Sequence, residues 1–267
     1  MRVLVTGSSS FTGYWFIREL VAAEHEVVAT FRSRRDSYDG VRKQRVEGLS
    51  SLCDCRFGLE FGTPDFLDVA ADGPWDLLCH HAAEVRDYRS PDFDVVSALA
   101  GNTRGCGAVF ERLVSTGCGR VVVTGSVFEQ DEGAGDEPLR AFSAYGLSKG
   151  LSWDVLRHYG GAAGLVVSKF VIPNPFGPLE EPRFTSYLAR TWLGGQRATV
   201  STPDYVRDNI HVGLLAKAYA AFAGGQMPGQ VLRPSGYVGP QGWFAGLMAA
   251  QLAPRLGVPC ELELSVQ

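Results

Sequence analysis

The fold prediction rests first on residues 2–23, RVLVTGSSSFTGYWFIRELVAA. Its first residues, Arg2 to Thr6, form a short run rich in β-branched side chains, which is typical of a strand. From Thr12 to Ala23, apolar residues recur at the spacing of one helix face. The stretch therefore predicts a strand, a tight turn and a helix in succession, which is the repeating unit of an α/β fold.

The turn in this stretch, TGSSSFTG, has the form of a dinucleotide-binding turn. Gly7 permits the tight turn, Gly13 permits close packing of helix on strand, and Ser10 stands where a three-glycine fingerprint has its middle glycine. A helix N-terminus presents free N–H groups and a positive dipole end to a pyrophosphate, and the Ser10 hydroxyl can add a donor. We therefore expect a dinucleotide to be bound by Gly7, Ser10, Phe11, Thr12 and Gly13. A glycine-rich turn that binds nothing is the alternative.

Further apolar runs alternate with helical patterns along the chain. The runs lie at residues 26–31, 75–80, 120–124 and 165–170, and the helical patterns lie at 92–115 and 143–160. This alternation, with runs as continuously hydrophobic as VVVTG, predicts an α/β fold with a doubly wound parallel (Rossmann) sheet that helices cover on both faces. Beyond residue 171 the chain is punctuated by Pro and Gly. We expect a dinucleotide-binding domain at 1–170 and a small C-terminal substrate-binding lobe at 171–267, with some interleaving.

Composition narrows the classes of partner. With 267 residues, 45% of them hydrophobic, the chain can bury the core of one large α/β domain or of a domain with a small lobe. The formal net charge of −4 gives no reason to expect nucleic acid or a membrane surface as partner. No apolar run reaches membrane-spanning length and no secretion signal precedes the first strand. Six scattered cysteines match neither a disulfide framework nor a metal-ligand spacing. We expect a cytoplasmic protein that binds a small molecule.

The end of the second strand bears on the choice of dinucleotide. An NAD enzyme usually carries an acid there for the ribose 2′-hydroxyl, but this chain reads TFRSRRD. Arg32, with Arg34 or Arg35, can neutralise the 2′-phosphate of NADP, which favours NADP over NAD. A solvated basic loop that continues through residues 42–45 explains the same residues.

Tyr145 and Lys149 lie four residues apart in the helical stretch AYGLSKGLSWDVL, so their side chains share one helix face. A neighbouring ammonium favours the phenolate form of a tyrosine, whose ordinary pKa is about 10. Such a tyrosine can take a proton from an alcohol as hydride leaves, or return it in the reverse direction. The preceding apolar run ends in hydroxyl residues, Thr124 and Ser126, at the sheet edge where ligands bind in such folds.

On these segments the chain resembles the extended short-chain dehydrogenases/reductases, in their nucleotide-sugar epimerase/dehydratase branch. The matching segments are TGSSSFTG, HHAA at 80–83, Asn102, Thr124, YGLSK, PNPFGP and VRDNIHV at 206–212. The resemblance implies that Thr124 is the catalytic hydroxyl and that Tyr145 and Lys149 are the acid/base pair, with Lys149 also holding the nicotinamide ribose. It further implies a cofactor lining of His80, Ala82, Ala83 and Asn102.

The resemblance also implies substrate contacts. Asn174 and Arg207 match residues that hold a substrate diphosphate, and a guanidinium suits phosphate oxygens; a surface Arg207 paired with Asp208 is the alternative. Glu84 directly follows HHAA and is a candidate specificity residue facing the substrate, unless it is simply exposed to solvent. Ser126 is a further candidate on the substrate side.

Departures from the family narrow the expected reaction. The 4,6-dehydratases carry Asp-Glu directly after the catalytic threonine, where this chain has Gly125 and Ser126, so we do not expect dehydration. The adjacent histidines 80 and 81 lack a third ligand at useful spacing, so we expect no metal. The C-terminal lobe is shorter than in many relatives.

The resemblance thus implies NAD(P)-dependent chemistry at carbon 4 of a nucleoside-diphosphate sugar. We expect 4-epimerisation through a 4-keto intermediate; NADPH-dependent reduction of a 4-keto sugar would use the same residues. A non-catalytic dinucleotide sensor is the alternative of another class. The helical patterns at 92–115 and 143–160 suggest a homodimer joined by a helix bundle.

Overall fold

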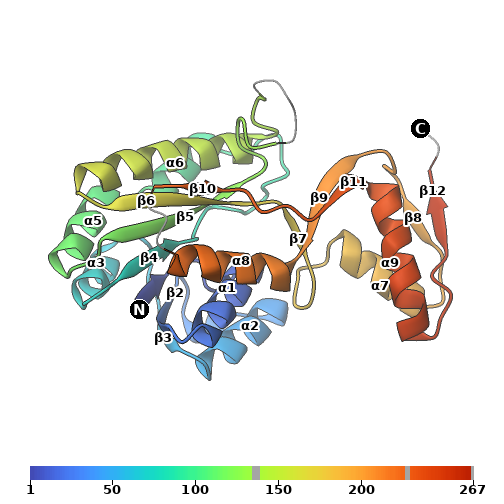
Figure 1. Cartoon of the computed structure of the whole chain (residues 1–267), viewed down its shortest axis with the longest axis horizontal. Helices are drawn as coiled ribbons and strands as arrows, with labels where there is room; N and C mark the ends of the chain where they lie inside the picture. Colours follow the sequence, from blue (N-terminus) through green and yellow to red (C-terminus); the bar gives the residue numbers. More distant parts are fainter. Residues whose placement is uncertain (134–138, 226–228, 266–267) are drawn as a thin grey trace. The chain divides into compact units, whose positions relative to one another are not determined.

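The computed structural model describes residues 1–133, 139–225 and 229–265, and in this part of the chain seven strands form a central sheet (Figure 1). The strands are β1 Arg2–Val5, β2 Glu26–Phe31, β3 Asp54–Phe57, β4 Leu77–His80, β5 Arg120–Ser126, β6 Val166–Ile172 and β10 Val231–Leu232. Their order is β10-β6-β5-β4-β1-β2-β3, and every neighbouring pair is parallel. The order reverses between β1 and β4, so the predicted doubly wound sheet is confirmed.

Helices cover both faces of this sheet (Figure 1). They are α1 Phe11–Ala22, α2 Gly40–Ser50, α3 Pro64–Ala71, α4 Val95–Asn102, α5 Cys106–Ser115, α6 Ala144–Ala162 and α8 Val212–Gly224, with the short 3-10 helix η1 Arg35–Ser37. Figure 1 shows α1, α2 and α8 on one face and α3, α5 and α6 on the other. No helix of the described residues is long and apolar enough to cross a membrane.

The single helix predicted at 92–115 is wrong, because the chain breaks between α4 and α5. Gly105 takes a left-handed conformation, with φ +55°, and a Cβ there would lie 2.8 Å from the carbonyl oxygen of Gly62. Gly62 has φ +77°, and a Cβ there would overlap the carbonyl of Arg104. Two loops therefore touch through two glycines, and this contact between residues distant in sequence ends the helix.

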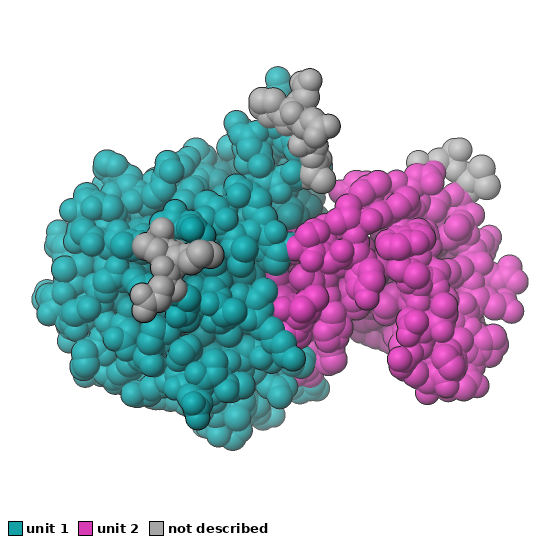
Figure 2. Space-filling view, viewed as in Figure 1, with its two compact units in different colours: residues 1–172, 216–234 teal, residues 173–215, 235–267 magenta. Residues whose placement is uncertain are grey.

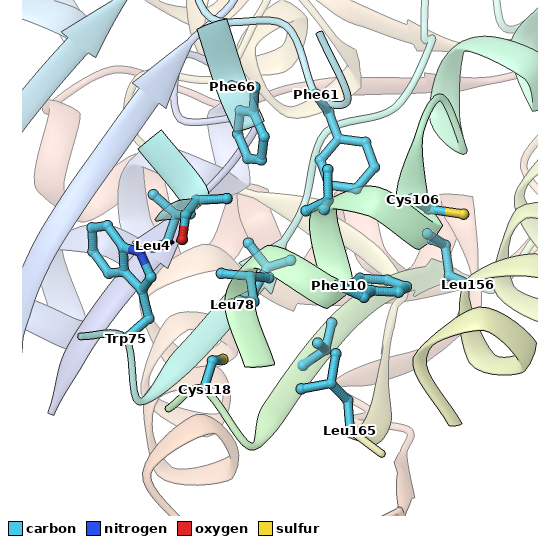
Figure 3. Packing of buried hydrophobic residues seen from close by; sticks show 14 of the residues in the cluster. Leu4, Phe61, Phe66, Trp75, Leu78, Cys106, Phe110, Cys118, Leu156 and Leu165 are labelled. Atoms are coloured by element: carbon cyan, nitrogen blue, oxygen red, sulfur yellow. Dashed lines mark hydrogen bonds between the residues drawn. The ribbon is translucent and has the colours of Figure 1, made fainter. Parts of the chain in front are cut away.

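The main core lies between the sheet and the helices α3, α5 and α6 (Figure 3). Leu4 and Leu78 project from adjacent strands, while Phe66 and Phe110 come from α3 and α5; all four are fully buried. Burial of one such side chain stabilises the fold by about 1.5–3 kcal/mol. The packing fixes the strands, and with them the loops that leave their C-terminal ends.

The described chain divides into two compact units, coloured separately in Figure 2. The first comprises residues 1–172 and 216–234, and the second comprises 173–215 and 235–267. The prediction placed the boundary at residue 170 and expected some interleaving; in the structure, most of α8 and all of β10 belong to the first unit. The reason is the pairing of Val231 with Lys169 across the edge of the central sheet.

The second unit has two small sheets. The elements are β7 Asn174–Phe176, β9 Val206–His211 and β11 Tyr237–Pro240 in one sheet, β8 Ala198–Val200 and β12 Leu262–Leu264 in the other, and the helices α7 Phe184–Leu193 and α9 Gln241–Leu256. Leu188, Trp192 and Ala245 pack with β8 into a core of its own.

Candidate functional site

The turn between β1 and α1 is packed too closely for side chains. Gly7 has φ +72°, and a Cβ there would lie 2.8 Å from the backbone nitrogen of Ala82 and from the carbonyl carbon of His81. A Cβ on Gly13 would lie 2.5 Å from the carbonyl oxygen of Gly7. Both glycines are therefore required by contacts within the protein, and the turn lies directly against the segment that follows β4.

Ser10 caps helix α1. Its Oγ accepts a hydrogen bond from the Gly13 N–H at 3.0 Å and donates one to the Gly7 carbonyl at 2.8 Å. The hydroxyl proton that we expected to reach a phosphate is thus used inside the turn. The helix still begins directly after the glycine turn at the end of β1, so its positive end and its first N–H groups fit a dinucleotide pyrophosphate.

Side chains from neighbouring elements hold the backbone after β4. The Thr6 Oγ1 accepts hydrogen bonds from the backbone N–H groups of His81 and Ala82, each at 3.0 Å. It also lies 3.1 Å from Nδ1 of His80, whose pKa burial lowers to about 3, with a smaller contribution from the charge of Lys149. His80 is therefore a neutral residue behind the predicted cofactor lining.

Asn102 holds the same segment from helix α4. Its Oδ1 accepts a hydrogen bond from the Glu84 N–H at 2.8 Å, and its Nδ2 donates to Ser152 Oγ on α6 at 3.1 Å. Both ends of its buried amide are engaged by the protein. Asn102 thus acts on the predicted lining through the backbone around Ala83.

His81 links the turn to the end of β5, a role that the sequence did not reveal. Its Nδ1 lies 2.8 Å from Oγ1 of Thr124, and its Nε2 lies 2.9 Å from both Ser10 Oγ and Thr12 Oγ1. Burial, followed by the charge of Lys149, lowers the pKa of His81 to about 3, so the ring is neutral. The available signal was alternation: adjacent residues at a strand end face opposite sides, so one of the two histidines had to face the turn.

Thr124 and Lys149, two of the predicted catalytic residues, are in contact. Lys149 Nζ donates a hydrogen bond to the backbone carbonyl of Thr124 at 2.6 Å. Both residues are buried, and burial lowers the pKa of Lys149, although the carboxylate of Glu129 acts in the opposite direction. Thr124 is therefore held twice, by Lys149 at its backbone and by His81 at its side chain.

Tyr145 lies in the first turn of α6. The helix begins after Ser143, whose Oγ accepts a hydrogen bond from the Gly146 N–H. A Cβ on Gly146 would lie 1.9 Å from the carbonyl oxygen of Phe128, so the loop after β5 rests directly on the helix. The half-buried ring of Tyr145 makes edge contacts with the rings of Tyr88 and Phe93, at centroid distances of 5.6 and 6.0 Å. Tyr145 and Lys149 both lie on α6, about one helical turn apart.

A buried ion pair occupies the space beside Gly125. Lys169 Nζ lies 2.6 Å from Glu129 Oε2 and 2.7 Å from Glu132 Oε1. A Cβ on Gly125 would lie 2.5 Å from Lys169 Cε. Ser126 is engaged as well: its N–H donates to Glu129 Oε1, and its Oγ accepts from the Phe128 N–H. A side chain at the position after Thr124 would have to displace this buried ion pair.

Glu84 faces arginines. Its Oε2 lies 3.7 Å from Arg32 Nη1 and 3.1 Å from Arg86 Nη2. The predicted cofactor residue Arg32, at the exit of β2, is thus partly neutralised by the residue that was expected to face the substrate. Within the described part of the chain, no group of three or more His, Cys, Asp or Glu side chains is placed to hold a metal ion.

In the second unit, polar side chains gather across β7 and β9. Arg207 Nη1 donates to Asn174 Oδ1 at 3.1 Å, and Asn174 Nδ2 donates to Asn209 Oδ1 at 2.5 Å. Asp208 instead accepts from the Gly236 N–H, so the alternative of an Arg207–Asp208 surface pair does not describe this site. Arg207 Nε and Asn209 Nδ2 are buried and have no hydrogen-bond partner among the described residues. The sequence prediction missed Asn209, although it stands two residues after Arg207 on the same strand face.

The chain is similar to known proteins over most of its length. The model of the NAD dependent epimerase/dehydratase family matches residues 3–231. Vestitone reductase from Medicago sativa is 22% identical over 94% of this chain and 81% of its own length. The UDP-glucose 4-epimerase of Thermotoga maritima is 18% identical, with a TM-score of 0.76 over 99% of this chain and 85% of that chain.

Another solved structure, the UDP-glucuronic acid 4-epimerase of Bacillus cereus in complex with UDP-glucuronic acid and NAD, has a TM-score of 0.74 at 16% identity. It covers 99% of this chain and 86% of that one. At such low identities, the similarity to these solved structures shows only that this chain shares their fold.

Proposed function

Because this chain belongs to the NAD-dependent epimerase/dehydratase family, we propose that it epimerises carbon 4 of a nucleoside-diphosphate sugar through a 4-keto intermediate. One observation carries the proposal. Thr124 lies between Lys149 and His81, and His81 reaches the glycine turn of a dinucleotide-binding fold. This linkage supports the proposal that the Thr124 hydroxyl and the Lys149 ammonium act beside a bound nicotinamide cofactor.

The protein's own groups have separable tasks in this reaction. Tyr145 takes the proton of the reacting hydroxyl and returns it, Thr124 holds the reacting oxygen by a hydrogen bond, and Lys149 favours the phenolate by its charge. The bound dinucleotide supplies the chemistry of hydride uptake and return. Burial of Lys149 lowers its pKa, so its positive charge is maintained at a cost and interacts strongly with nearby negative charge.

The unpaired donors of the second unit support a substrate with a diphosphate. Arg207 Nε and Asn209 Nδ2 are buried without a partner among the described residues, and a buried donor that lacks an acceptor costs about 1–3 kcal/mol. Phosphate oxygens satisfy several donors at once, and a guanidinium binds them in a forked geometry. We assign these two residues, with Asn174, to the diphosphate of the sugar nucleotide.

For the cofactor, the pair of Arg32 and Glu84 weakens the predicted preference for NADP. The 2′-phosphate of NADP would have to share Arg32 with a carboxylate 3.7 Å away. We therefore propose NAD as the cofactor, with Glu84 supplying from the β4 loop the negative charge that other NAD enzymes carry at the end of β2.

A 4-ketoreductase that uses NADPH is the second candidate, and the similarity to vestitone reductase favours it. The two candidates differ in how they hold the dinucleotide, since an epimerase returns its hydride within each turnover whereas a reductase must exchange the cofactor. Purified protein is denatured, and the released dinucleotide is identified by mass spectrometry. Retained NAD supports the epimerase; protein that is empty and takes up NADPH contradicts it.

An assay for conversion of sugar nucleotides distinguishes the epimerase from a dinucleotide sensor that catalyses no reaction. Purified protein is incubated with UDP-glucose, UDP-glucuronic acid and dTDP-glucose, and the sugars are followed by anion-exchange chromatography. An epimerase converts one of them to its 4-epimer. If no epimer forms while NAD binds and stabilises the protein, the sensor is favoured.

We also propose a homodimer. Leu147, Leu151 and Tyr159 project from α6 with 42, 38 and 48% of their surface exposed, and Val96 on the neighbouring helix α4 is 76% exposed. Apolar side chains of this kind on packed helices suit a second copy of the same face. Light scattering after gel filtration should give a mass twice that of one chain. The Leu151→Glu variant should give the mass of a single chain.

A further inference from the structure

We propose that Glu129 is a positioning residue of the site, whose carboxylate holds the end of β5 beside Thr124 and maintains the positive charge of Lys149. Glu129 is 1% exposed and stands three residues after the end of β5. Its Oε1 accepts a hydrogen bond from the Ser126 N–H at 2.6 Å, and its own N–H donates to the Ser126 carbonyl at 3.0 Å. The carboxylate is therefore fixed to the end of the strand that carries Thr124.

Lys149 and Glu129 hold the same short piece of β5. Lys149 Nζ donates to the Thr124 carbonyl at 2.6 Å, two residues before the N–H that Glu129 binds. Two residues of strand span about 6.6 Å. A Cβ on Gly125, which stands between the two contacts, would lie 2.9 Å from Glu129 Oε1. A buried ammonium and a buried carboxylate therefore lie close to each other at the end of the strand.

The second oxygen of Glu129 faces helix α6. A Cβ on Gly150, the residue after Lys149, would lie 4.0 Å from Glu129 Oε2. This buried oxygen lies 2.6 Å from Lys169 Nζ, but it has no hydrogen-bond partner among the described residues. Lys169 instead donates a hydrogen bond to Glu132 Oε1 at 2.7 Å. Because Lys169 is shared between two carboxylates, negative charge of Glu129 remains to act on Lys149.

The charges around Lys149 act in different directions. Burial lowers the pKa of Lys149, the carboxylate of Glu129 raises it, and the charge of Lys169 lowers it further. Glu129 is therefore the group that opposes the effect of burial. The other titratable or charged groups around this region are the neutral His80 and His81 after β4, Tyr145 on α6, Glu132 in the loop after β5, and Arg233 after β10.

The consequence for catalysis rests on the proposed function. Lys149 favours the phenolate of Tyr145 only while it carries its proton. A buried lysine loses that proton more readily than an exposed one, so a carboxylate beside it extends the pH range over which Tyr145 and Lys149 act together. Glu129 acts through Lys149 and needs no contact with the substrate.

The direct test is the titration of Lys149. The chain has four lysines, so labelling lysine Cε with 13C gives four signals, and Lys149→Met identifies the relevant one. In Glu129→Gln, which keeps the shape of the side chain and an acceptor for the Ser126 N–H, the pKa of Lys149 should fall by about one pH unit or more. Glu132→Gln is the matched control, because it removes the other carboxylate from the same Lys169 and should leave the pKa of Lys149 in place. No fall in Glu129→Gln, or equal falls in both variants, overturns the inference.

Lys169→Gln serves if Glu129→Gln does not fold. It removes the ammonium nearest to Glu129, so that the carboxylate acts on Lys149 alone and the pKa of Lys149 should rise. An unchanged or lower pKa of Lys149 in Lys169→Gln overturns the inference.

The pH dependence of UDP-glucose conversion gives a second readout. Its alkaline limb should move to lower pH in Glu129→Gln, by the same shift as the Lys149 signal, and should stay in place in Glu132→Gln. A purely structural role of Glu129 would lower turnover at every pH without moving the limb, and that result overturns the inference. A protein that converts no sugar nucleotide contradicts the proposed function instead, and the titration of Lys149 still decides the inference.

Discussion

Two regions of the molecule differ in how completely their polar groups are hydrogen-bonded within the protein. They are the turn around His81 in the first unit and the polar cluster around Arg207 in the second. Around His81, each ring nitrogen lies within hydrogen-bonding distance of a hydroxyl, and Gly7 and Gly13 stand where a side chain would collide with neighbouring backbone. Around Arg207, two buried donors have no partner in the described chain. The first region is therefore preorganised by the protein, whereas we propose that a ligand completes the second.

The largest effect should come from the preorganised region. Tyr145→Phe removes the group that exchanges the proton, so turnover should fall by about 10²–10⁴-fold while the fold and NAD binding persist. Conversion of the sugar nucleotide is measured beside a thermal melt. Tyr159→Phe, on the same helix but exposed, is the matched control and should keep full activity. Turnover that survives in Tyr145→Phe rules out the proposed mechanism.

Arg207→Ala tests the polar cluster of the second unit, which we propose binds the substrate diphosphate. It should weaken binding of UDP-glucose by about 10–100-fold, because a charge-assisted contact is lost, and should leave NAD affinity unchanged. Isothermal titration with each ligand gives both numbers. Arg207→Lys should recover little, since a lysine lacks the fork. Arg197→Ala, which removes an exposed arginine of the same unit, should have no effect. An equal loss of NAD affinity would contradict the proposal that Arg207 binds the substrate and not the cofactor.

Gly7→Ala should damage the preorganised turn itself. The left-handed backbone conformation and the contact with Ala82 N at 2.8 Å together should cost about 1–3 kcal/mol of unfolding free energy and weaken NAD binding. Urea unfolding and titration with NAD measure the two effects. Gly58→Ala is the control, because Gly58 has φ +75° but nothing within 4 Å of an added Cβ. Equal losses in both variants would show that strain alone, rather than close packing, explains Gly7.

Acid should lower the free energy of unfolding through His81, which lies in the preorganised region. Burial lowers the pKa of His81 from 6.5 to about 3. Below pH 6.5, His81 is therefore protonated in the unfolded chain while it is still neutral in the folded chain. The stability present above pH 6.5 is therefore lost as the pH falls towards 3, by up to about 1.4 kcal/mol per pH unit for this residue. His81→Phe should flatten the decline between pH 7 and pH 5 in urea unfolding. The exposed residue His158, changed to Gln, should not. Parallel curves for wild type and His81→Phe would show that His81 does not stay neutral in the folded chain.

The smallest effect concerns the cofactor. Glu84→Gln removes the carboxylate beside Arg32 and Arg86, so the ratio of NADP to NAD affinity should rise about fivefold, as for an exposed charge interaction. Fluorescence titration with both dinucleotides measures the ratio, and Glu47→Gln, an exposed acid on α2, is the control. An unchanged ratio would remove Glu84 from the choice of cofactor.

The sequence predicted those features that consecutive residues encode. The order of strand, turn and helix at residues 2–23, the parallel sheet and the shared helix of Tyr145 and Lys149 all follow from local periodicity and from glycine placement. The same holds for Gly125 in place of a carboxylate, which is visible in the residue type alone.

Only the tertiary structure decided which distant residues meet. His81 and Thr124 are 43 positions apart, and Arg32 and Glu84 lie on different strand exits. The break between α4 and α5 depends on a loop that contains Gly62, and α8 and β10 return to the first unit because β10 pairs with β6. Local patterns fix the type of each element and the face that it buries. Contacts between elements depend on strand order and register, which no stretch of consecutive residues contains.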